Sequence, residues 1–204
     1  MHVPKSGGRM ITGEMAASGF KPTEEQKKQG VKDLLYEMEQ MISVAEKLPD
    51  APQLRLGEEC ALLESLLVHV RNLHEVFSTR KRRDPLDGPD KTILCKDYSF
   101  PSKNCLSQEM VKRVNDYLFH VRYGREDSQS WHIGAFRGVF KQAAEFLTHL
   151  EEDIYPDGAL GRKMAQRMSC AKQKLGSLMA AEYSQATAWT SVSEPSVEDA
   201  SFRV

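Results

Sequence analysis

The sequence predicts an all-α fold, an up-and-down bundle of four main helices with an additional C-terminal helix. Apolar residues recur at spacings of three and four along most of the chain, which is the period of helices that bury one face. The sequence contains no strand-like alternation of any length and no internal repeat. With 204 residues, of which 40% are hydrophobic, the chain is long enough to form a substantial core.

Composition divides the chain into four parts. Residues 1–21 are rich in glycine, serine and lysine and lack periodicity, so we expect a flexible N-terminal tail. Residues 22–155 are expected to form the helical bundle domain, and residues 156–188 the additional C-terminal helix. Residues 189–204 have the polar composition of a disordered tail.

The first two main helices carry the clearest periodicity. Thr23 and Gln26 form a capping-box pattern that begins a helix reaching about residue 48, where prolines follow. Its expected core positions are Val31, Leu34, Leu35, Met38, Met41, Ile42 and Ala45. The second helix, at about residues 54–79, is so apolar that we expect it to be central. Its expected core positions are Leu62, Leu63, Leu66, Leu67, Val70, Leu73 and Phe77.

The remaining elements are separated by turn residues. A basic loop at residues 80–90 precedes a short helix near residues 91–98, and Ser107 is expected to cap a third main helix that ends near Gly124. A fourth main helix is expected at about residues 131–151. The C-terminal helix has a thin apolar stripe, which could cover the bundle or contact a protein partner. That stripe consists of Leu160, Met164, Met168, Leu175, Leu178 and Met179.

Charge and cysteine usage narrow the class of protein. The formal net charge is −1, so no global field attracts nucleic acid or an anionic membrane. The four cysteines have neither CxxC nor zinc spacing, and no glycine-rich phosphate loop is present, so neither a metal nor a cofactor is expected. There is no secretory signal and no stretch of about 20 apolar residues. We therefore expect a soluble, cytoplasmic protein without a membrane partner.

Two polar clusters are the candidates for chemistry. The second helix carries His69, Arg71, Asn72 and His74 within two turns. In a structural interpretation, Arg71 pairs with Glu75 one turn later and the histidines are hydrogen-bonded at the edge of the core. In a functional interpretation, Arg71 and a histidine converge with another helix to bind or cleave a phosphate-bearing substrate. The arginine fork suits phosphate oxygens, and a histidine can act as a general acid or base near neutral pH.

The other cluster lies on the third helix. Arg113 and His120 are seven residues apart and therefore share a helix face, while Asn115 and Arg122 share another. Arg125 follows just after the expected end of the helix. This cluster is either an ordinary helix surface with cations near the C-terminus or part of a groove shared with the second helix.

The order of several motifs gives a resemblance over about residues 55–150. An apolar helix carrying His-x-Arg and then an aromatic residue is followed by Lys96-Asp97-Tyr98, by Val114-Asn115 leading to His120, and then by Arg125 and Trp131. This arrangement resembles a segment of uncharacterised bacterial proteins and is similar to the HEPN superfamily of helical bundles. Members of that superfamily often dimerise, and many are ribonucleases in which four to six residues lie between a catalytic arginine and a catalytic histidine.

The resemblance implies a metal-independent endoribonuclease that acts on RNA as a homodimer. Arg113 and His120 match the long limit of the HEPN spacing and would be the catalytic pair. The residues that would bind substrate are His69, Arg71, Asn72, Asn115 and Arg125. The alternative is a non-catalytic protein-interaction or ligand-binding helical module, in which the same polar residues fix the contacts between helices.

Overall fold

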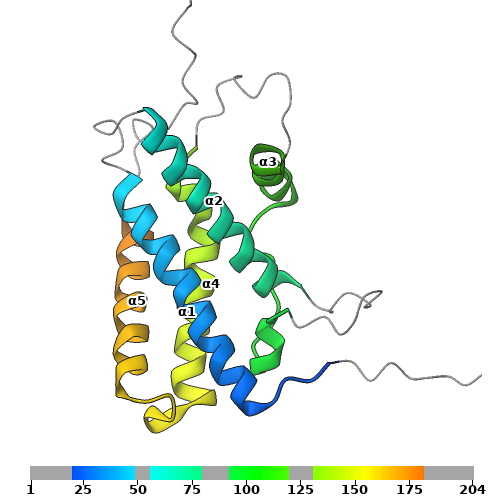
Figure 1. The fold of residues 1–204 in the computed structure, drawn as a ribbon, viewed down its shortest axis with the longest axis vertical. Helices are drawn as coiled ribbons and strands as arrows, with labels where there is room; N and C mark the ends of the chain where they lie inside the picture. The colour runs from blue at the N-terminus through cyan, green and yellow to red at the C-terminus, as the bar shows by residue number, and fades with distance from the viewer. Residues whose placement is uncertain (1–19, 49–55, 80–91, 120–130, 182–204) are drawn as a thin grey trace, which may run out of the picture.

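The computed structural model describes residues 20–48, 56–79, 92–119 and 131–181, and these residues form five α-helices (Figure 1). The prediction of an all-α fold is confirmed. The helices are α1 (Glu24–Lys47), α2 (Leu56–Ser78), α3 (Gln108–Phe119), α4 (Arg137–His149) and α5 (Arg162–Ala180).

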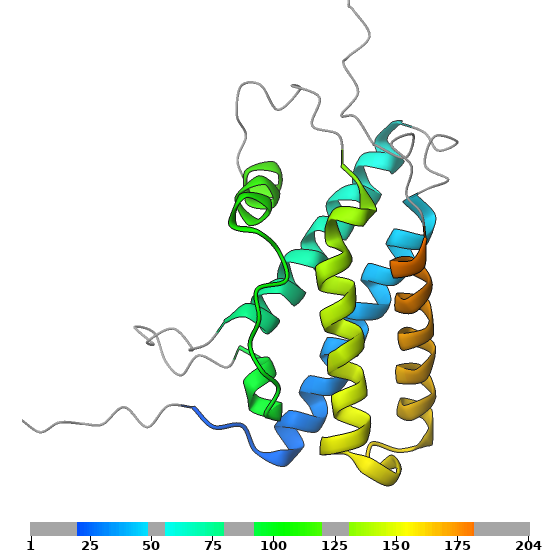
Figure 2. The same ribbon diagram turned by 180° about the vertical axis from the view of Figure 1, so that it is seen from behind.

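Four long helices, α1, α2, α4 and α5, lie side by side, and α3 lies beside α2 away from α5 (Figures 1 and 2). In the view of Figure 1, α1 and α5 run upward and α2 and α4 run downward. The direction therefore alternates within the α1–α2 pair and within the α4–α5 pair, whereas α2 and α4 run the same way. The helix expected to be an addition, α5, thus completes the bundle, while α3 stands outside it.

Helix α1 begins as its sequence predicts. The Thr23 side chain accepts a hydrogen bond from the Gln26 backbone N–H at 3.2 Å, and the Gln26 side chain accepts one from the Thr23 N–H at 2.8 Å. This capping box satisfies two donors that the first helical turn leaves unpaired. All seven expected core positions of α1 are buried.

Helices α2 and α5 bury the stripes that their periodicity predicts. In α2, six of the seven expected core positions are buried, and Leu62 is half-buried against the core. In α5, Met164, Met168, Leu175 and Leu178 of the thin stripe are buried, together with Ala171. The apolar face of α5 is therefore covered by the chain itself.

Two ion pairs join α1 to α5. Arg167 donates two hydrogen bonds to the Glu39 carboxylate at 2.9 and 2.6 Å, and Lys174 lies 2.8 Å from Glu46. From the first pair to the second, the residue number increases by seven in α1 and by seven in α5. The two helices therefore run parallel to each other. Because these groups are partly exposed, each pair stabilises the fold by about 0.2–1 kcal/mol.

The stretch between α2 and α3 contacts the start of α1 and caps the start of α3. The expected short helix is a 3₁₀ turn, Cys95–Tyr98, whose Tyr98 hydroxyl donates to the Lys27 carbonyl oxygen at 2.8 Å. Gly30 permits this contact, because a Cβ there would lie 2.5 Å from the Tyr98 oxygen. Farther along, the Ser107 hydroxyl accepts from the Met110 N–H at 3.1 Å, as the predicted cap requires.

The fourth predicted helix is divided into three parts. A 3₁₀ turn, Ile133–Phe136, leads into α4, and a π-helical turn, Leu150–Ile154, follows it. The His149 imidazole at this junction donates from Nε2 to the Tyr98 carbonyl oxygen at 2.7 Å, and its Nδ1 lies 2.6 Å from Asp153. Within the described ranges, no helix is both long enough and apolar enough to cross a bilayer.

Candidate functional site

The members of the α2 cluster contact two different neighbouring helices, α1 and α3. His69 Nδ1 lies 2.7 Å from Glu37 Oε2 of α1, and the Asn72 side chain donates to the same oxygen at 3.4 Å. Both α2 residues are partly buried, so one α1 carboxylate holds two of the residues that were predicted to bind substrate. These contacts fix how α2 lies against α1.

Arg71 points toward α3 instead. Its Nε donates to Asn115 Oδ1 at 2.9 Å, and both side chains are partly buried. This contact brings together one member of each predicted cluster. It is also one of the direct links between α3 and the bundle.

Arg113, the predicted catalytic arginine, faces another neighbour. Its guanidinium carbon lies 4.2 Å from the centre of the Trp131 ring, a cation–π geometry that stabilises by about 0.5–2 kcal/mol. Burial lowers the pKa of Arg113, and the nearby Glu109 carboxylate partly offsets that shift. Tyr117 also packs edge-on against Trp131, with the two ring centres 5.5 Å apart.

The predicted pair of Arg113 and His120 stays a prediction, because His120 and Arg125 lie outside the described residues. Arg113 and Asn115 are separated by about 200° around α3, since each residue of a helix turns by about 100°. Arg113 contacts Trp131 and Asn115 contacts Arg71, so the described members of the two clusters are distributed among separate helix contacts.

A cysteine–histidine pair escaped the sequence analysis, because its two members are 31 positions apart. His74 Nδ1 lies 3.3 Å from Cys105 Sγ. Burial lowers the pKa of His74, although Glu75 opposes this effect, and burial raises the pKa of Cys105 to about 11. Both shifts favour the neutral forms, so this is a contact between a neutral imidazole and a neutral thiol rather than an activated thiolate.

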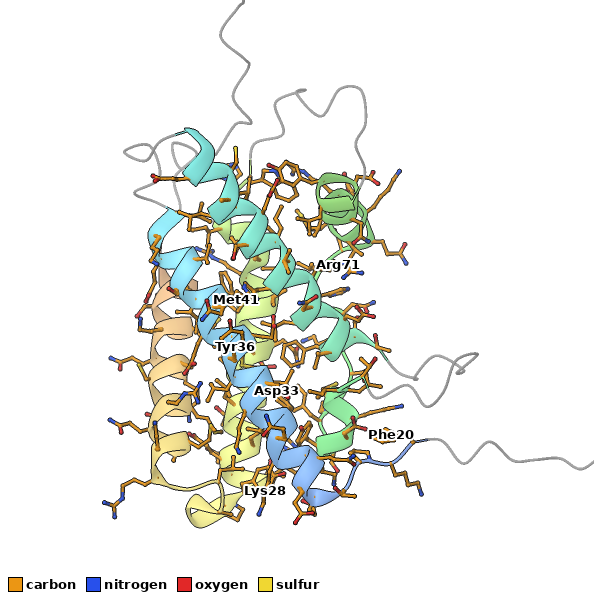
Figure 3. The ribbon with its side chains drawn as sticks, in the orientation of Figure 1. Phe20, Lys28, Asp33, Tyr36, Met41 and Arg71 are labelled. Carbon is orange, nitrogen blue, oxygen red and sulfur yellow. The ribbon has the colours of Figure 1, made fainter. Side chains whose placement is uncertain are left out.

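An open groove between α1, α2 and residues 92–93 also escaped the sequence analysis. It has a volume of about 360 Å³, and its apolar lining includes Leu34, Val76 and Ile93. Three carboxylate residues, Asp33, Glu37 and Glu75, also line it. We call this hollow the α1 groove; Figure 3 labels Asp33 and Tyr36, which lie on its α1 side.

The α1 groove adjoins a second hollow of about 240 Å³, since both are lined by Asp33, Thr92 and Ile93. Tyr36, which lines the α1 groove, is 54% exposed, and it is one of two large hydrophobic residues exposed in the described structure. Periodicity marked neither feature, because a groove depends on how separate elements meet. Asn72 is the one predicted substrate-binding residue among the described groove-lining residues.

Within the described residues, no group of three or more His, Cys, Asp or Glu side chains is arranged to hold a metal ion. Comparison with known proteins gives no match: no family model, no curated protein and no solved structure matches this chain. The similarity to the HEPN superfamily therefore stays a prediction.

Proposed function

We propose that this chain is a non-catalytic helical module that binds another molecule through the α1 groove. The observation that carries the proposal is the separation of the two arginines, with Arg71 on Asn115 and Arg113 on Trp131. A ribonuclease of the predicted type needs its basic residues directed at one phosphate. Here each arginine serves a different contact between elements.

The location of the groove supports the binding part of the proposal. Binding sites are commonly concave, mostly apolar and supplied with a few polar groups. The α1 groove has those properties, and it lies where α1 packs against α2. Its three carboxylates would repel the phosphates of RNA, so RNA is a poor occupant of this groove.

The experiment is an RNA cleavage assay on the full chain. A mixed RNA pool is incubated with the wild-type protein and with the His120→Ala variant, in the presence of EDTA. We expect both proteins to leave the RNA intact at the level of a buffer control. EDTA-resistant cleavage by the wild type that is lost in His120→Ala would refute the proposal and establish the predicted ribonuclease.

The structural role of the two clusters is tested with a separate variant and a stability measurement. Asn115→Ala removes the acceptor for Arg71, so we expect its thermal unfolding midpoint to fall, with a loss of about 1–3 kcal/mol. An unchanged midpoint would show that the Arg71–Asn115 contact contributes nothing to the stability of the helix arrangement.

A further inference from the structure

We propose that the occupant of the α1 groove is a short basic segment of another protein, carrying lysine or arginine next to apolar residues. This inference rests on the proposed function and names its class of partner. The apolar lining of the groove, the charge of its walls and the exposed Tyr36 support it.

The apolar lining determines one part of the partner. Leu34 is 3% exposed and contributes to the floor, and the partly buried Val76 and Ile93 flank it. A volume of about 360 Å³ lies at the lower end of the range for ligand pockets. An apolar side chain of a peptide therefore gains burial there that it lacks in water.

The charged walls determine the other part. Asp33, Glu37 and Glu75 come from two helices, and none of the described residues lining the groove is basic. Glu37 is engaged by His69 and Asn72, which holds its carboxylate in place. A cationic segment complements these three carboxylates, because opposite charges steer association and fix the register of binding.

Tyr36 adds an aromatic surface at the same place. A tyrosine that is 54% exposed in the middle of a helix leaves a large apolar ring in water. Its ring face attracts a lysine or arginine cation, and its edge can cover an aliphatic stem. Lysine and arginine side chains offer both an apolar stem and a cationic end, which matches the groove.

The test uses fluorescence anisotropy with the full chain and a labelled peptide, GLRKLRLG. The control peptide, GLEELELG, keeps the leucines and reverses the charge. We expect saturable binding of the basic peptide that weakens at about 0.5 M salt, where charges are strongly screened, and no binding of the acidic peptide. Equal binding of both peptides, or no binding of the basic one, would overturn the inference.

Variants then locate the binding site. Asp33→Asn and Glu75→Gln are each expected to weaken binding about three- to tenfold, and Tyr36→Ala by at least about threefold. Glu145→Gln is the matched control, because Glu145 is an exposed α4 carboxylate that does not line the groove. A loss in Glu145→Gln as large as that in Asp33→Asn would overturn the assignment to the α1 groove.

Two other possible occupants of the α1 groove are a basic segment of this same chain and a second copy of the protein. If peptide binds only after the basic residues at positions 80–83 are changed to serine, the chain itself occupies the groove and the inference fails. If the protein self-associates in sedimentation and Asp33→Asn abolishes this, the occupant is a second copy, and the inference also fails. Failure of peptide binding leaves the RNA cleavage result unaffected, so the two proposals are tested separately.

Discussion

His74 illustrates how burial changes a residue that belongs to one of the two predicted polar clusters. Its imidazole sits beside the Cys105 thiol near the end of α2, and burial disfavours its charged form. The same burial keeps the thiol protonated, so proximity of the two groups does not produce a nucleophile. The pair instead acts as a neutral contact between α2 and the stretch before α3.

This environment predicts a pH dependence of stability. In the unfolded chain the imidazole takes up a proton near the ordinary pKa of 6.5, while the folded chain takes it up only at lower pH. Between these two pKa values the unfolded state binds more protons than the folded state does. The free energy of unfolding therefore decreases as the solution is acidified through this range. We expect His74→Gln to show a smaller decrease between about pH 7.5 and pH 5 than the wild type.

Chemical denaturation at several pH values measures this difference. The slope of stability against pH is compared between the wild type and His74→Gln, so that contributions of other groups cancel. Identical slopes would show that His74 is as easily protonated in the folded protein as in the unfolded chain.

Among the helices, α4 shows what sequence periodicity can and cannot predict. Phe140, Ala143 and Leu147 recur at helical spacing, and all three are buried. The division into a 3₁₀ turn, a helix and a π turn was not found, because the same spacing is compatible with one continuous helix. The two helix caps were predicted correctly, because Thr23 and Ser107 each bond to a residue within one turn.

The site was harder to predict than the helices. The spacing of Arg71 and Asn115 within their own helices did not show that they bond to each other, because their helices meet at a distance of 44 residues along the chain. Spacing likewise gave no sign that Arg113 would lie over Trp131. A helical period determines which residues share a face, and the path of the whole chain determines what that face meets.

Two helical glycines give a matched prediction about elements. Gly138 lies near the start of α4, where an added Cβ would be 2.2 Å from the Cys105 carbonyl oxygen. Gly176 lies within α5, where the same atom would meet nothing within 4 Å. We expect Gly138→Ala to destabilise by about 1–3 kcal/mol, since the backbone must shift. Gly176→Ala should stabilise by about 0.5–1 kcal/mol through better helix propensity.

Thermal and urea unfolding of the two variants test this contrast. The important result is the opposite sign of the two changes, because both substitutions add the same methyl group. A destabilised Gly176→Ala together with an unchanged Gly138→Ala would contradict the close approach of α4 to the stretch before α3.

At the scale of the whole molecule, α5 determines whether the bundle is complete. The expected division placed the bundle in residues 22–155 and treated the C-terminal helix as an addition. In the structure, α5 buries Met168 and Leu175 against the common core and pairs with α1 through Glu39 and Glu46. Removing it would expose the apolar side of both neighbours to water.

We therefore expect a chain ending at residue 158 to lose cooperative unfolding. Circular dichroism during heating should show a broad, early transition, and a dye that binds exposed apolar surface should fluoresce more strongly than with the full chain. The full chain serves as the control in the same buffer. A sharp transition in the shortened chain would show that residues 22–155 are a self-sufficient domain.

The parallel contact between α1 and α5 also bears on synthesis of the protein. Arg167 and Lys174 meet partners that lie 128 positions earlier in the chain. On a ribosome, α1 is synthesised well before α5. Part of the apolar surface of α1 therefore stays uncovered in the nascent chain until α5 emerges. The speed of translation through α5, and chaperones that shield α1 until α5 is made, would then influence how much protein reaches its folded form.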